Sequence, residues 1–279
     1  MFDPERQKQE RKDLAEALRD LRRASGLSGE RLATRCAMSQ SKISRIECGK
    51  ILPSISDVQR ILTALGVADD AAKPFLDLAR VANVHYRSVR ALAEKGLWRG
   101  QDELAALVDS SSLVRYFVPA VPSGMLQTRD YATAILTPVI RGRPARNVER
   151  AVDARIRRQR AIYDHSREFV FVMTEQTARW RRANAAIMAA QCHHMADLTE
   201  LPNVTIAMIP NTAEINCGPL NSFTVYDERF VLVELFSGSV MLRDPRDVSY
   251  HINILNHFLD RALRGTRAAN LLRRIANEF

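Results

Sequence analysis

Residues 28–49, SGERLATRCAMSQSKISRIECG, contain two short amphipathic segments separated by a tight break. In the first segment, apolar side chains recur at the three- and four-residue spacing that places them on one helix face: Leu32, Ala33 and Cys36. Ile43 and Ile46 repeat that spacing in the second segment. The stretch is therefore predicted to form two helices that share one apolar core, which is the arrangement of a helix-turn-helix.

The ends of both helices are marked by residues with a capping role. Ser28 and Ser39 each stand just before a helix, where a side-chain oxygen can accept a hydrogen bond from a first-turn N–H group. Gly49 is predicted to stop the second helix.

Polar side chains gather on the face of the second helix opposite Ile43 and Ile46: Gln40, Ser41, Lys42, Ser44 and Arg45. Glutamine matches the donor and acceptor of adenine, arginine matches the two acceptors of guanine, and serine serves either role in the major groove. This face is predicted to read DNA base edges. The alternative is an ordinary helical hairpin with a solvated polar face.

Residues 28–50 resemble the DNA-binding motif of the Cro/repressor (Xre) family over its whole length. The resemblance implies that the outward polar side chains lie in or beside the groove, and that Lys42 and Lys50 are available to phosphates. The predicted DNA-binding residues are Ser39, Gln40, Ser41, Lys42, Ser44, Arg45 and Lys50.

Two positions depart from the family pattern. Ala37 stands at a turn position where the family usually has glycine, and a left-handed backbone there costs a non-glycine residue roughly 1 kcal/mol. A distorted turn is therefore expected. Gly29 replaces a glutamine or serine at the start of the first motif helix, so a side-chain phosphate contact is expected to be absent.

Three further helices are predicted around this motif. Leu14, Leu18 and Leu21 form a stripe over residues 10–24, from which Arg22 is predicted to point away. A capping box at Ser54 begins a helix that stops at Gly66, and another helix follows over residues 71–81. Because helices this short are unstable alone, residues 1–84 are predicted to share one core as a five-helix DNA-binding domain.

Length, charge and cysteine usage limit the class of protein. A chain of 279 residues favours two domains. The net charge of +9, from 41 basic and 32 acidic residues, suits a phosphate-bearing partner, although general solubility would explain it too. The four cysteines show no paired spacing, and no apolar run approaches the roughly 20 residues that span a bilayer. Reduced thiols and a cytoplasmic location are expected, with no signal peptide and no membrane role.

The second half of the chain is predicted to contain both helices and strands. Residues 85–112 are predicted to form a helical connector that is closed by three serines. Residues 113–279 alternate helices with short β-rich runs, the runs being 169–173, 204–209, 222–226, 231–235 and 240–242. Helices are predicted at 128–136, 183–198, 248–263 and 266–277. The chain is thus expected to be mainly α, with an α+β C-terminal domain that contains a small mixed sheet.

A second resemblance covers nearly all of this half. Residues 113–136 are similar to the start of the WhiJ-like C-terminal domain of unknown function in actinobacterial Xre-family regulators. The matching residues are Tyr116, Pro119, Pro122, Met125, Leu126, Gln127, Thr128, Asp130, Tyr131 and Ala132. The likeness continues at residues 148–163, 201–204, 218–219, 223 and 242–245. It implies small acidic partner proteins encoded beside such regulators.

Chemistry beyond DNA binding has little support in the sequence. Cys192, His193, His194 and Asp197 offer metal-ligand atoms, but no HExxH pattern accompanies them and they do not make a closed site. No nucleophile elbow, GxGxxG or Walker loop is present. We expect no enzyme activity, no cofactor and no resident metal.

The arginine-rich helix over residues 148–163 has two interpretations. Its basic side chains are those of Arg146, Arg150, Arg155, Arg157, Arg158 and Arg160. They belong either to a solvated amphipathic helix or to a surface that meets an acidic partner or a second subunit. Similarly, residues 231–236, VLVELF, with the single acid Glu234, form either a core strand or an exposed edge.

The sequence predicts a DNA-binding transcriptional regulator. One recognition helix covers few base pairs, so a dimer on a palindromic operator is expected. The alternative is an interaction protein that acts through a small acidic partner, in an antitoxin-like pairing, with DNA binding serving autoregulation.

Overall fold

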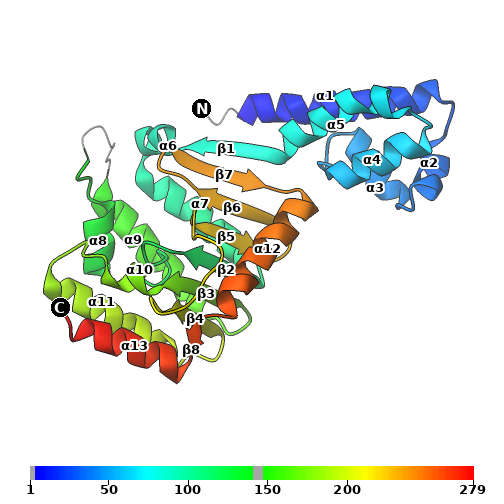
Figure 1. The fold of residues 1–279 in the computed structure, drawn as a ribbon. Coiled ribbons are helices and arrows are strands. Elements are labelled where there is room, and N and C mark those ends of the chain that lie inside the picture. Colours follow the sequence, from blue (N-terminus) through cyan, green and yellow to red (C-terminus); the bar gives the residue numbers. More distant parts are fainter. Residues whose placement is uncertain (1–3, 141–146) are drawn as a thin grey trace. The chain divides into compact units, whose positions relative to one another are not determined.

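The computed structural model of the chain describes residues 4–140 and 147–279, which form two compact units (Figure 1). The first unit runs to Tyr86 and includes Met241–Arg246. The second unit comprises Arg87–Val240 and Asp247–Phe279.

The first unit is a five-helix bundle. Its helices are α1 (Pro4–Ala24), α2 (Gly29–Arg35), α3 (Gln40–Glu47), α4 (Ile55–Ala64) and α5 (Asp69–Asn83). The predicted stripes meet in one core, in which the buried large side chains are Leu14, Leu18, Leu32, Ile43, Ile46, Val58, Ile61 and Leu62. At Ser54 the predicted capping box is formed in both directions, since Asp57 returns the contact to the Ser54 N–H. The five-helix prediction is confirmed.

The second unit is built on a mixed sheet. Its strands are β2 (Leu113–Val118), β3 (Glu168–Thr174), β4 (Val204–Ile209), β5 (Phe223–Tyr226), β6 (Phe230–Glu234), β7 (Gly238–Leu242), whose last two residues are counted with the first unit, and β8 (Leu263–Arg264). They lie in the order β7-β6-β5-β2-β3-β4-β8. The β2–β3 and β3–β4 pairs are parallel, whereas the β2–β5, β5–β6 and β4–β8 pairs are antiparallel. The α+β prediction for this half is confirmed.

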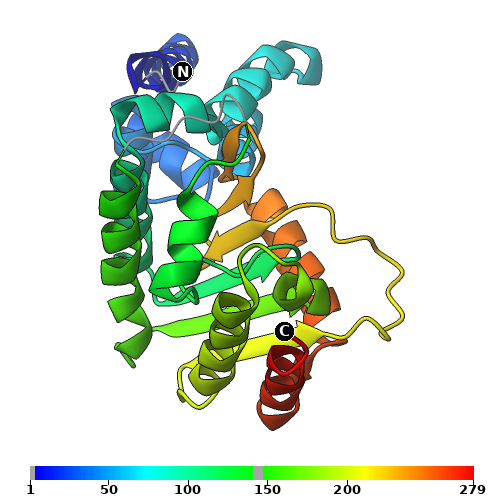
Figure 2. The same ribbon diagram turned by 90° about the vertical axis from the view of Figure 1, so that its left-hand side faces the viewer.

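Helices cover both faces of this sheet. They are α6 (Val89–Lys95), α7 (Leu97–Asp109), α8 (Arg129–Leu136), α9 (Val148–Gln159), α10 (Glu175–Arg179), α11 (Ala185–Leu198), α12 (Pro245–Leu259) and α13 (Thr266–Ala276). Phe117 of β2 stacks on Phe258 of α12 with ring centroids 4.5 Å apart. Helices α8 and α9 lie on the opposite face from α12 (Figures 1 and 2).

Two segments differ from the sequence-based expectation. The helix predicted over residues 248–263 ends at Leu259, because Leu263 and Arg264 pair with Met208 and Ala207 as an extra edge strand. Residues 85–112, predicted as a helical connector, contain most of β1 (Val84–Ser88) followed by α6 and α7. Helices α6 and α7 are part of the second unit.

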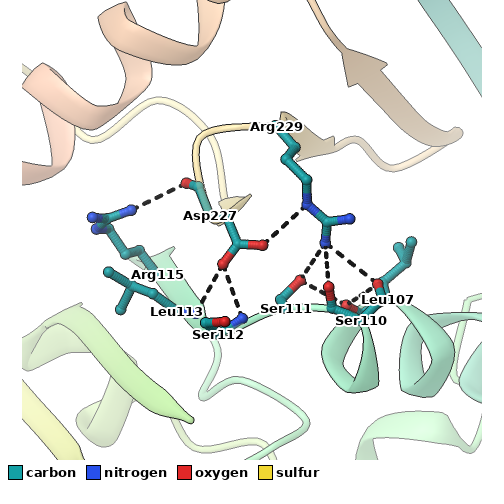
Figure 3. Close-up of polar contacts among 8 residues, drawn as sticks. All are labelled: Leu107, Ser110, Ser111, Ser112, Leu113, Arg115, Asp227 and Arg229. Carbon is teal, nitrogen blue, oxygen red and sulfur yellow. Dashed lines mark hydrogen bonds and ion pairs between the residues drawn. The ribbon is translucent and has the colours of Figure 1, made fainter. Parts of the chain in front are cut away.

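A polar cluster joins the end of α7 to the sheet (Figure 3). Asp227, in the β5–β6 turn, has φ 53° and accepts hydrogen bonds from the N–H groups of Ser112 and Leu113 at 2.9 Å. Arg229 donates to the Ser110 carbonyl at 2.7 Å and to the Ser111 hydroxyl at 2.8 Å. The three serines therefore anchor the start of β2 to the β5–β6 hairpin.

Candidate DNA-binding surface

Helix α3 is capped at its start and held from behind. The Ser39 side chain accepts a hydrogen bond from the Lys42 N–H at 3.1 Å, and Ser28 does the same for α2. Ile43 and Ile46 are 1% and 0% exposed, respectively. Because both isoleucines are buried, they fix the rotation of α3 about its axis, and the opposite face of α3 points to solvent.

That opposite face carries four of the predicted residues. Gln40, Ser41, Ser44 and Arg45 are all exposed, and so is Lys50 just beyond the helix end. Glutamine can donate to and accept from adenine at once, and arginine can donate two hydrogen bonds to guanine. The surface formed by Gln40, Ser41, Ser44 and Arg45 is called the reading face below, and its contact with bases stays a prediction.

Lys42 has a different position from its neighbours on α3. Its Nζ lies 2.9 Å from Asp57 Oδ1, and Arg60 Nη2 lies 2.8 Å from the same oxygen. Asp57 is only 6% exposed. Burial raises the pKa of Asp57, but the hydrogen bonds and charges of Lys42 and Arg60 outweigh that effect and the pKa is lowered overall. The Lys42 ammonium, which the family resemblance makes available to phosphates, therefore joins α3 to the start of α4.

A second ion pair holds the far end of α3 and was not expected from the sequence. Arg22 of α1, predicted to point away from the core, donates from Nε and Nη2 to the two carboxylate oxygens of Glu47 at 2.6 and 2.9 Å. Its Nη1 also donates to the Leu27 carbonyl at 3.0 Å. Two parallel hydrogen bonds fix direction as well as distance. Arg22 lies one helical turn after Leu18, on the buried side of α1. This spacing is the feature of the sequence that could have indicated the ion pair.

The turn between α2 and α3 keeps a left-handed residue at its centre. Ala37 has φ 51°, while the Ala37 N–H donates to the Thr34 carbonyl and the Met38 N–H donates to the Ala33 carbonyl at 3.0 Å. This pair of bonds is the motif in which helices end on a left-handed glycine. The distortion expected at Ala37 is not seen, because alanine adopts the strained conformation itself.

Gly29 begins α2 and has open space around it. A Cβ built there meets no heavy atom within 4 Å, so no steric demand requires glycine at this position. Because Gly29 has no side chain, only its backbone could contact a DNA phosphate at the start of α2.

The larger part of the chain, residues 101–274, matches the family described as a domain of unknown function (DUF5753). The chain belongs to the DUF5753 family. In front of the DUF5753 region, residues 13–75 match a helix-turn-helix domain, a range that contains α2, α3 and α4 whole.

One solved structure is similar to this DUF5753 chain, that of TrmBL2, an archaeal chromatin protein described as showing a novel mode of DNA binding. The identity is 12% and the TM-score is 0.34, over 74% of this chain. The match spans 65% of the TrmBL2 chain. No curated protein matches the chain.

Two further observations concern other sites. Among the described residues, no helix is both long and apolar enough to cross a membrane.

Cys192, one of the four neighbours with metal-ligand atoms, is 0% exposed and its thiol faces the Ala178 carbonyl, whereas His193 is exposed. Burial raises the pKa of the Cys192 thiol to about 12. The side chains of Cys192 and His193 therefore do not face a common point.

Proposed function

We propose that the protein is a cytoplasmic, sequence-specific transcriptional regulator whose reading face enters the major groove of DNA. The observation that carries the proposal is the reading face itself. Its four polar side chains are exposed together on α3, while the opposite side of that helix is locked to the core. The helix-turn-helix match over residues 13–75 supports DNA binding as the activity. The resemblance to Xre-family regulators with a WhiJ-like second domain supports the same proposal.

We infer further that the protein binds a palindromic operator as a homodimer. A helix of eight residues reaches only a few base pairs, and two copies related by a two-fold axis read two half-sites one helical turn apart. No catalytic role is proposed, since the sequence lacks the motifs that activate a nucleophile or hold a nucleotide phosphate.

Binding to DNA fragments tests this function. The full chain is titrated with the promoter of its own gene, with other promoter fragments and with random DNA of equal length. Arg45→Ala and Gln40→Ala are each expected to cost about 1–3 kcal/mol on the preferred fragment, the range for a bidentate base contact. Lys73→Ala, an exposed change on α5, is the control and is expected to bind like wild type.

Two results together would overturn the proposal: no fragment binds more tightly than random DNA, and both α3 variants bind like wild type. A loss in the α3 variants that is equal on all fragments would instead show backbone contacts without base reading.

A second candidate is action through a small acidic partner. The second unit exposes large apolar side chains, with Leu220 at 88% and Phe236 fully exposed, and the chain carries a net charge of +9. Complementary charge speeds and selects protein association. Co-purification with the product of a neighbouring short reading frame would support this candidate. A free homodimer with full operator binding and regulation would exclude it.

A further inference from the structure

A cavity of about 240 Å³ lies inside the second unit against one face of its sheet. Its floor is formed by alternate residues of three neighbouring strands: Tyr116 and Val118 of β2, Thr224 and Tyr226 of β5, and Leu232 and Glu234 of β6. Tyr116 pairs with Thr224 and Thr224 with Leu232, so these side chains point to the same side. The intervening Phe117 and Phe223 face α12 instead.

Two arginines of α9 form the wall opposite this floor. Arg155 and Arg158 are each 9% exposed and line the cavity. They lie on the same helix face as the fully buried Ala151, at positions where an apolar residue is usual. Arg157, between them in sequence, is exposed with a side-chain accessibility of 56%. The two interpretations of this helix as a solvated or partner-binding surface are therefore wrong for Arg155 and Arg158.

The two guanidinium groups differ in the hydrogen bonds that the protein provides to them. Arg155 donates to Gln127 Oε1 at 2.5 Å and to Gln101 Oε1 at 3.3 Å. Arg158 Nε is buried and has no hydrogen-bond partner among the residues that the structure describes. An unpaired buried donor on a charged group is costly, so the protein keeps the Arg158 guanidinium beside the cavity at an energetic cost.

The segment between β2 and α8 makes room for the arginines. A Cβ on Gly124 would lie 2.7 Å from Arg158 Nη2 and 3.1 Å from Arg155 Nε, so a side chain here would displace both. Gln159 of α9 donates to the carbonyls of Gly124 and Gln127 at 2.9 and 2.7 Å. The glycine and its tethers therefore preserve the space in front of the guanidinium groups.

The charges around the cavity leave a positive excess. Glu234 is the one acidic side chain of the lining, against two arginines. Glu234 is an exposed residue at the end of β6. Desolvation raises the pKa of its carboxyl, an effect that the charges of Arg155 and Arg158 oppose. Desolvation also raises the pKa of Tyr116, which keeps its phenol a neutral donor. One further negative charge would balance the site.

We propose that this cavity is a binding site for a small organic carboxylate with an apolar body. The planar fork of Arg158 matches a carboxylate, and Leu104, Val121 and Ile135 supply apolar lining. At roughly 30 Å³ for each water, the volume holds about eight waters, which suits a small metabolite. Phosphate fits less well, because its second charge would face Glu234. All the lining residues belong to the second unit, so the proposal does not depend on the reading face.

Binding of pyruvate and benzoate to the full chain tests the proposal, with pyruvamide and benzamide as neutral matches and inorganic phosphate as a third probe. Ligand-detected NMR titration is the measurement. At least one carboxylate is expected to bind saturably and about tenfold or more tightly than its amide, and more tightly than phosphate. Arg158→Gln is expected to remove this preference, and Arg157→Gln, the matched control on the exposed side of α9, to keep it.

Glu234→Gln is a second test that leaves both arginines in place, and it is expected to change carboxylate affinity in the opposite direction. It deletes the competing carboxylate and is expected to tighten carboxylate binding several-fold. Thermal unfolding checks that each variant folds, and if Arg158→Gln does not, the Glu234→Gln result decides. Equal binding of acids and amides, no saturable binding below about 10 mM, tighter binding of phosphate, or unchanged or weaker binding in Glu234→Gln would each overturn the proposal.

Discussion

Ala37 stores backbone strain at the centre of the helix-turn-helix. Its φ of 51° places a Cβ where glycine is usual, and that costs roughly 1 kcal/mol or more. Ala37→Gly is therefore expected to raise the free energy of unfolding by about 0.5–1 kcal/mol, since relief of strain exceeds the added chain entropy. Urea unfolding followed by circular dichroism at 222 nm measures the change.

Gly66 provides the matched control for Ala37. It ends α4 with φ 72°, and an added Cβ meets no heavy atom within 4 Å. Gly66→Ala is expected to lower stability by about 1 kcal/mol through backbone strain alone. If Ala37→Gly destabilises the protein as Gly66→Ala does, the turn is not strained in the way described.

At the scale of helices, Asp57 links α3 and α4 through Lys42 and also caps α4. Its pKa is lowered in the folded protein, so its contribution is fully present above the unfolded pKa of about 3.9 and is lost as the pH falls through the folded value. Asp57→Asn is expected to cost about 1.5–3 kcal/mol at pH 7. The difference from wild type should shrink steadily below about pH 4.

Asp70→Asn is the control for this pH series. Asp70 pairs with Lys73 on α5, but both side chains are exposed and such pairs contribute at most about 1 kcal/mol. Urea unfolding at a series of pH values compares both variants with wild type. A difference for Asp57→Asn that stays constant from pH 7 to about pH 3 would show that the charge of Asp57 does not act as described.

At the scale of the whole molecule, a dimer doubles the effect of each phosphate contact. The slope of log K against log salt is negative. Removal of one phosphate contact reduces its magnitude by about 0.9 in a monomer, and by about 1.8 when two subunits bind one operator. Lys50, exposed after α3, is expected to give the larger value as Lys50→Gln. Operator binding at several salt concentrations measures the slope.

Lys42→Gln serves as the comparison, because the Lys42 ammonium lies 2.9 Å from Asp57 and is already paired. Its slope is expected to stay close to that of wild type, even where affinity falls through loss of the α3–α4 contact. A drop of about 0.9 for Lys50→Gln would indicate one subunit on each operator. Equal drops for the two lysines would show that Lys42 leaves Asp57 for a phosphate.

The sequence by itself determined the helices and strands that depend on local spacing. The stripe of Ile43 and Ile46, the caps at Ser39 and Ser54 and the exposed reading face all follow from side chains three or four residues apart. Such interactions form within one turn of helix, so they can be read directly from the order of residues.

Only the tertiary structure decided which charged side chains are paired or buried. Lys42 meets an acid 15 residues away, Arg22 one 25 residues away, and Arg155 an amide 28 residues away. For the same reason the strand at Leu263–Arg264 exists only because β4 offers it backbone partners. A charge is buried or solvated according to the groups that packing brings to it, and packing joins residues whose separation along the chain follows no period.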